Sequence, residues 1–215
     1  MTRLAGLKFA NTIYWLLLAL WFGALVMSAV TAGVLFPTMR DLEVVVPAYE
    51  SISELDGEHW RIAAGRAQNT IFFANDLIQL ACSVGVAIIL GLHLSVFRMS
   101  IMRFSNAIRT AAIGFALVAL AYHLFILAPR MQTQLVEFWS VTEHGDIDRA
   151  LAARAAFDEA HPTGTRVLVF ITICVMTAII ASAAALTTPE EDAPTIAARR
   201  PGALEEPELL KRPRG

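Results

Sequence analysis

Four long apolar runs constrain this sequence more than any other feature. They cover about residues 12–36, 70–94, 108–127 and 167–186. A membrane-spanning helix needs roughly 20 mostly apolar residues, because the hydrocarbon layer is about 30 Å thick and each helical residue rises about 1.5 Å. Each run reaches that length. We therefore predict an all-α fold, a bundle of four transmembrane helices.

The composition agrees with a chain that contacts lipid. Of the 215 residues, 56% are hydrophobic and only 17% are charged, whereas soluble domains carry about 25% charged residues. The net charge of −2 and the lack of a basic aromatic patch argue against nucleic acid as a partner. The cysteines Cys82 and Cys174 lie in apolar runs, where we expect them to be packing residues.

Two segments follow from this pattern. Residues 1–187 are predicted to form the integral membrane domain, and the Pro-rich, mixed-charge segment 188–215 is predicted to be a disordered cytoplasmic tail. The connection between the second and third runs contains Arg98, Arg103 and Arg109 and no acid, whereas the other two connections have an acidic excess. Because short basic loops face the cytoplasm, both termini should be cytoplasmic. The expected location is a bacterial inner membrane.

The two halves of the chain resemble each other. The first and third runs are closed by Pro37 and Pro129, and each is followed by a segment with apolar residues on one helical face. We therefore expect two tandem helix-pair repeats, with amphipathic interfacial helices in the two long outer loops. The predicted faces are Leu42, Val45, Val46 and Tyr49 in one loop, and Met131, Leu135, Phe138 and Trp139 in the other.

Small residues at fourfold spacing indicate where the four helices pack. Such residues allow close backbone approach, which matters because lipid provides no hydrophobic drive between helices. They are Ala24, Ser28 and Ala32 in the first run, Ala112 and Ala116 in the third, and Ala178 and Ser182 in the fourth.

The second run contains three polar residues, Asn75, Asp76 and Gln79. An ionised carboxylate at the centre of a bilayer costs about 2.5–3.5 kcal/mol on insertion scales. We therefore expect Asp76 to face the bundle interior and to pair with another group. His123, at a similar distance from the outer end of the third run, is the predicted partner. Asp158 and His161 precede the fourth run and should lie at the outer mouth of the same cluster.

Three interpretations of this cluster remain open. Its residues can tie helices together by hydrogen bonds, handle a proton or cation, or bind a metal ion. Candidate metal ligands are His123, His161 and Asp76, with the soft sulfurs of Met39 and Met131 nearby.

Several short motifs resemble the transmembrane protein 205-like family, a group of four-helix integral membrane proteins. They are Trp21-Phe22-Gly23, Phe36-Pro37, Pro129-Arg130-Met131, and Phe157-Asp158 with His161. The resemblance covers about residues 15–186 and implies a membrane bundle without an established activity. A eukaryotic relative is linked with tolerance of platinum drugs, which favours transport or a soft metal. Pro162-Thr163-Gly164 departs from the serine-bearing helix start that the family pattern implies.

Two functional hypotheses follow. The first is a small membrane protein that transports or senses a small solute, proton or cation through the polar cluster. The second is a structural or accessory subunit that packs its helices against a larger membrane complex. No nucleophile, base and oxyanion donors can be assembled from the sequence, so an enzyme is disfavoured. We expect no cofactor. The expected partners are membrane lipid and either a second copy of the chain or a larger complex.

Overall fold

The computed structural model describes residues 3–50 and 52–187 and is all-α, with no strand in that part of the chain. The predicted disordered tail, 188–215, lies outside the described residues. The elements in chain order are α1 (Arg3–Asp41), the 3-10 turns η1 (Pro47–Tyr49) and η2 (Ser53–Leu55), α2 (His59–Ser95), α3 (Phe104–Tyr122), the π-helical turn η3 (His123–Leu127), α4 (Ala128–Glu143) and α5 (Ile147–Thr187).

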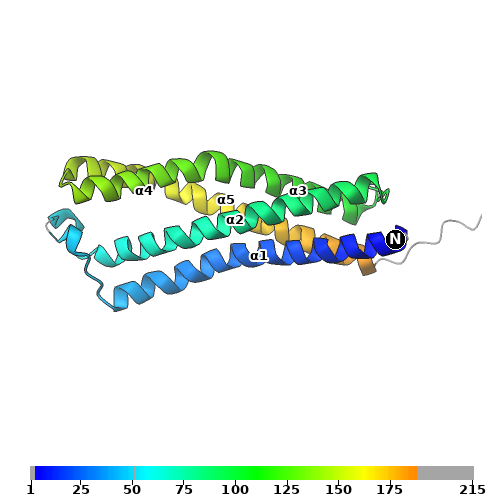
Figure 1. The fold of residues 1–215 in the computed structure, drawn as a ribbon, viewed down its shortest axis with the longest axis horizontal. Coiled ribbons are helices and arrows are strands. Elements are labelled where there is room, and N and C mark those ends of the chain that lie inside the picture. Colours follow the sequence, from blue (N-terminus) through cyan, green and yellow to red (C-terminus); the bar gives the residue numbers. More distant parts are fainter. Residues whose placement is uncertain (1–2, 51, 188–215) are drawn as a thin grey trace, which may run out of the picture.

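The helices lie side by side in an elongated bundle (Figure 1). The start of α1, the α2–α3 connection and the end of α5 share one end, which we call the terminal end. The α1–α2 and α4–α5 connections share the opposite end, which we call the loop end. The main packing partners are α1 with α2, and α5 with both α3 and α4, while α1 also contacts α5.

Four helical stretches are long and apolar enough to cross a membrane: residues 4–41, 59–95, 104–142 and 147–185. Each covers one predicted apolar run to within one residue, so the all-α prediction with four candidate spans is confirmed. The helices are longer than the runs because their polar flanks at the loop end stay helical. Large apolar side chains, among them Phe73, Val118 and Phe125, are exposed on the outside of the bundle. Such a surface suits contact with lipid.

The predicted interfacial helix in the first outer loop is wrong. Within residues 42–50 and 52–58 the structure has only two 3-10 turns, the first of which begins at Pro47. Leu42 and Val45 are exposed, whereas Tyr49 is buried with its ring centroid 6.0 Å from that of Phe138. Packing against α4 therefore decides the path of this loop. In the second outer loop the predicted face is helical, but α4 follows α3 directly through η3 rather than forming a separate helix.

The predicted packing residues largely face the interior. All are buried except Ala32, which is partly buried. An additional close approach joins α1 to α2 at Gly85, where an added Cβ would lie 2.6 Å from Leu17 Cδ1. The core between the helices is formed by Tyr14, Leu18, Trp21, Val86, Ile113 and Ile171, with smaller residues around them.

A glycine and an aspartate form the tight turn between α4 and α5. Gly145 has φ +76°, a left-handed conformation that only glycine adopts without strain. The Asp146 side chain then accepts a hydrogen bond from the backbone N–H of Arg149 at 3.3 Å, which caps the first turn of α5. This turn sets α5 antiparallel to α3 and α4.

Candidate functional site

Asp76 and His123 meet between two helices in the interior of the bundle. His123 Nε2 lies 3.3 Å from Asp76 Oδ1. Asp76 is near the middle of α2, and His123 is near the middle of the helical run formed by α3, η3 and α4. The His123 side chain is 9% exposed and the Asp76 side chain is 20% exposed. The structure thus brings together the two residues for which the sequence predicted a pair.

Gln79 completes this group. It follows Asp76 by three residues, so both side chains lie on one face of α2. Its Nε2 donates a hydrogen bond to Asp76 Oδ1 at 3.4 Å. The same carboxylate oxygen therefore receives Gln79 and faces His123. We call Asp76, Gln79 and His123 the central triad.

A π-helical turn positions His123. Residue Ala128 donates its backbone N–H to the His123 carbonyl, five residues back, where an α-helix would use the fourth residue. The next residue, Pro129, has no N–H and cannot continue the α-helical ladder. A π turn inserts one extra residue and is frequent at functional sites. The proline that the sequence placed at the end of a span thus shapes the backbone at the histidine.

Two atoms of the central triad have no hydrogen-bond partner within the described residues. They are His123 Nδ1 and Gln79 Oε1, and both are buried. A buried polar atom without a partner costs roughly 1–3 kcal/mol. Gln79 Oε1 can only accept a hydrogen bond, and His123 Nδ1 can donate or accept. The triad therefore has unused capacity for a water, a proton or a small cation.

Asn75 belongs to a different contact. Its Nδ2 donates a hydrogen bond to Ser28 Oγ on α1 at 2.8 Å, and both side chains are buried. About two turns earlier on α2, Gln68 donates to the Ser28 carbonyl at 3.4 Å and to Thr31 Oγ1 at 3.2 Å. These bonds join α1 to α2. The spacing of small residues marks Ser28 only as a packing residue, because nothing in a single sequence pairs it with Asn75.

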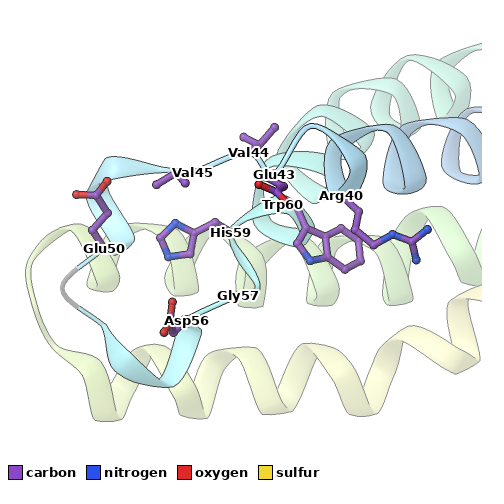
Figure 2. A pocket seen from close by; sticks show the side chains of 9 residues that line it. All are labelled: Arg40, Glu43, Val44, Val45, Glu50, Asp56, Gly57, His59 and Trp60. Atoms are coloured by element: carbon purple, nitrogen blue, oxygen red, sulfur yellow. The ribbon is translucent and has the colours of Figure 1, made fainter.

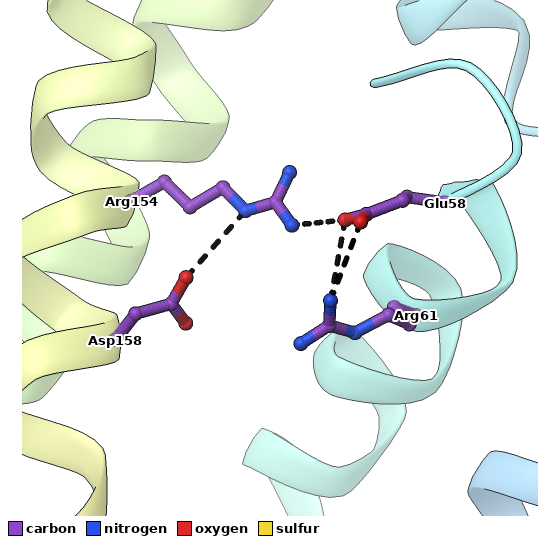
Figure 3. A network of polar contacts seen from close by, with 4 residues as sticks. All are labelled: Glu58, Arg61, Arg154 and Asp158. Carbon is purple, nitrogen blue, oxygen red and sulfur yellow. Dashed lines mark hydrogen bonds and ion pairs between the residues drawn. The ribbon is translucent and has the colours of Figure 1, made fainter. Parts of the chain in front are cut away.

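Asp158 is separated from the central triad. Its carboxylate is 53% exposed and lies 3.8 Å from Arg154 Nε on α5. Arg154 also pairs with Glu58, which lies 3.4 Å from Arg61 (Figure 3). Since Glu58 directly precedes α2, Asp76 lies about 27 Å further along that helix, at about 1.5 Å per residue. This network at the loop end ties α2 to α5.

His161 is also outside the triad. It is exposed on α5, and its ring packs against that of Phe157 at 5.2 Å between centroids. The sequence placed Asp158 and His161 at the mouth of the cluster because the fourth span was expected to begin near residue 167. In the structure α5 begins at Ile147, so both residues lie on a long helical extension.

The described residues contain no group of three or more His, Cys, Asp or Glu side chains that could hold a metal ion. Of the candidate ligands, Asp76 and His123 form one contact. Met131 packs against α5, where a Cβ added at Gly164 would lie 3.3 Å from its sulfur. Met39 is at the end of α1 and is partly buried. The metal interpretation gains no support from this arrangement.

The loop end also has an open cavity of about 470 Å³ between the end of α1, the first outer loop and the start of α2 (Figure 2). Its lining includes acidic residues, a histidine and a tryptophan. His59 is fixed by its Nδ1, which accepts the Val46 backbone N–H at 3.1 Å. The lining residues with polar or aromatic side chains are Arg40, Glu43, Glu50, Asp56, His59 and Trp60.

No protein-family model, curated protein or solved structure matches this chain. The resemblance to the transmembrane protein 205-like family stays a prediction.

Proposed function

We propose that this chain is a small integral membrane protein that moves a proton or a small cation through the central triad. The observation that carries the proposal is the 3.3 Å contact between Asp76 Oδ1 and His123 Nε2, made by side chains from two different helices. Ionisable residues inside transmembrane segments are expensive to bury and commonly mark ion or proton pathways. Four candidate spans support the membrane location.

The chemistry of the pair suits proton transfer. Imidazole exchanges protons near neutral pH and has two nitrogens, so it can receive a proton on one side and release it on the other. Nε2 faces the carboxylate, and Nδ1 is the buried nitrogen without a partner. A proton arriving at one nitrogen can therefore leave from the other. Gln79 holds the carboxylate in place from the adjacent turn of α2.

The proposal includes a topology. Both chain ends would be cytoplasmic, because the α2–α3 connection is the basic one. Both ends of the four-span domain lie at the same end of the bundle, as this topology requires. The two helix pairs, α1 with α2 and α3–α4 with α5, would be tandem copies of one unit.

The alternative is a structural or accessory subunit. The hydrogen bond between Asn75 and Ser28 favours it, because this buried contact has no other evident role than joining α1 to α2. In this alternative, the contact between Asp76 and His123 joins α2 to η3 in the same way.

Proton flux in vesicles tests the proposal. The purified chain is reconstituted with an internal pH dye, and a pH gradient is imposed while the membrane potential is clamped. We expect Asp76→Asn and His123→Gln to fold and to abolish the flux. Asp158→Asn is the matched control, since it makes the same chemical change at the loop end, and it should keep the flux.

Two results would count against movement of a proton or a small cation through the central triad. One is wild-type protein that conducts neither protons nor sodium or potassium ions above empty vesicles. The other is Asp76→Asn protein with full flux. Loss of folded protein in Asp76→Asn, together with stoichiometric copurification of other subunits with the wild-type chain, would instead support the structural alternative.

A further inference from the structure

A second buried polar group lies at the terminal end, away from the central triad. All four spanning helices contribute to it: Tyr14 from α1, His93 from α2, Arg109 from α3 and Ser182 from α5. Their exposed fractions are 1%, 2%, 7% and 2%. Met99, from the α2–α3 connection, covers the group. We call these five residues the Arg109 cluster.

Tyr14 and Ser182 are satisfied by each other. Ser182 Oγ donates its hydrogen to the Ala178 carbonyl at 2.6 Å. The 3.3 Å contact between Tyr14 OH and Ser182 Oγ must then be donated by tyrosine. This bond joins α1 to α5 and fixes the Tyr14 ring, over which the Arg109 guanidinium lies.

Arg109 is a buried cation without a counter-charge. Within residues 3–50 and 52–187 no carboxylate lies within ion-pairing distance of its guanidinium, which sits 5.4 Å from the centroid of the Tyr14 ring. One of its NH₂ groups donates to the sulfur of Met99, a weak acceptor. Its Nε is buried and has no partner among the same residues. Burying an unpaired charge is strongly unfavourable.

His93 adds a second unsatisfied donor. Both of its ring nitrogens are buried and lack a hydrogen-bond partner in the described part of the chain. Any protonation state of imidazole carries at least one N–H. The ring is held 5.7 Å from that of Tyr14 and 5.9 Å from that of Phe97. Arg109 and His93 thus both lie next to the Tyr14 ring, and the Nε–H of Arg109 and the ring N–H of His93 have no acceptor among the described residues.

We propose that the Arg109 cluster binds an oxyanion of the phosphate type. A guanidinium presents several N–H groups in a plane, which matches phosphate oxygens and neutralises their charge. Arg109 lies only about 8 Å from the first residue of α3, at about 1.5 Å per residue, so the site is close to the end of the bundle. Exposed Arg98 and Arg103 in the adjoining connection would attract the anion.

The α2–α3 connection is the route of access. Met99 is held next to the cluster by its backbone N–H, which donates to the His93 carbonyl at 2.9 Å. Its side chain is flexible and its sulfur contact with Arg109 is weak, so an anion can displace it. The phosphate can belong to a lipid headgroup or be free in solution. Basic pockets between transmembrane helices bind lipid phosphates in this manner.

Thermal stability of the purified full-length chain in a phosphate-free detergent tests the site. One arm adds inorganic phosphate against chloride at equal ionic strength, and the other adds phosphatidylglycerol against an uncharged glycolipid. We expect at least one phosphate compound to raise the Tm of the wild-type chain. Arg109→Met should weaken the apparent affinity about tenfold to a hundredfold, the loss expected for a charge-assisted bond.

Arg103→Met is the matched control, because it removes the same charge from an exposed position of the same connection. It should lose much less affinity than Arg109→Met, because an exposed charge attracts the anion from a distance and donates no hydrogen bond to it. Stabilisation by phosphatidylglycerol alone assigns a lipid headgroup, and stabilisation by inorganic phosphate assigns a free oxyanion. If Arg109→Met does not fold, Arg109→Lys serves, with a several-fold loss expected because ammonium lacks the planar donors.

The proposal is overturned if neither compound stabilises the wild-type chain, or if the folded Arg109 variant binds as tightly as wild type. Equal losses in the Arg103 and Arg109 variants would also overturn it, because the effect would then come from general surface charge.

Discussion

Replacing Ser28 by alanine is expected to destabilise the contact between α1 and α2. Its hydroxyl makes two hydrogen bonds, since it donates to the Ala24 carbonyl at 3.1 Å and accepts from Asn75 Nδ2 at 2.8 Å. Alanine removes the Ser28 Oγ acceptor, so the buried Asn75 amide loses its hydrogen-bond partner. An orphaned buried amide costs about 1–3 kcal/mol, so the variant should lose stability in that range.

A double-mutant cycle isolates the bond. Asn75→Leu alone should cost less than Ser28→Ala, because Ser28 keeps its bond to Ala24 when the amide is gone. The coupling free energy of the Ser28→Ala, Asn75→Leu pair should be about 0.6 kcal/mol and at most about 1.7 kcal/mol, the range found for hydrogen bonds between transmembrane helices. Reversible unfolding by SDS in mixed micelles gives the free energies. The fluorescence of Trp21, which is buried, reports the transition.

The control pair combines Asn75→Leu with Ser182→Ala at the terminal end. Distant sites should add within about 0.5 kcal/mol. If the Ser28–Asn75 pair is equally additive, or if Ser28→Ala has wild-type stability, then the 2.8 Å contact does not hold α1 and α2 together and the reasoning fails.

Two further predictions concern the loop end. Glu58→Gln removes the ion pair with Arg154 and should lower the unfolding free energy by only about 0.5–1 kcal/mol, because both side chains are partly exposed. This loss should shrink at 1 M salt, where the screening length is about 3 Å. A loss that does not depend on salt would contradict an electrostatic origin. Gly145→Ala should destabilise by about 1–2 kcal/mol because φ is +76°, whereas Gly65→Ala, inside α2 with no atom within 4 Å of the added Cβ, should stabilise by about 0.4–1 kcal/mol. Thermal unfolding of the two glycine variants measures the contrast, and equal shifts would show that backbone conformation is not the cause.

The sequence alone determined the architecture. Four apolar runs of spanning length leave few options, because a lipid-exposed backbone must satisfy its hydrogen bonds within each segment and a helix does so. The small residues of the runs also face the interior largely as expected. These features depend on composition and local spacing, which a sequence displays directly.

Part of the candidate site was also predictable. Asp76 stands out as a carboxylate in an apolar run, and His123 lies at a similar position in another. Counting residues from the helix ends placed them at one level, and their side chains lie 3.3 Å apart. The same counting failed for Asp158 and His161, because helix α5 extends well beyond the apolar run. Asp158 pairs with Arg154, which also pairs with Glu58, and His161 packs against Phe157.

Only the tertiary structure decided which polar groups have partners. Asn75 is satisfied by Ser28, whereas Arg109, which the sequence assigned to a basic loop, is buried beside Tyr14 and His93. The first outer loop packs through Tyr49 against α4 instead of forming an amphipathic helix. Each of these outcomes depends on contacts between residues far apart in the chain. Helical periodicity fixes the face on which a side chain lies, but the packing of neighbouring helices fixes what that face meets.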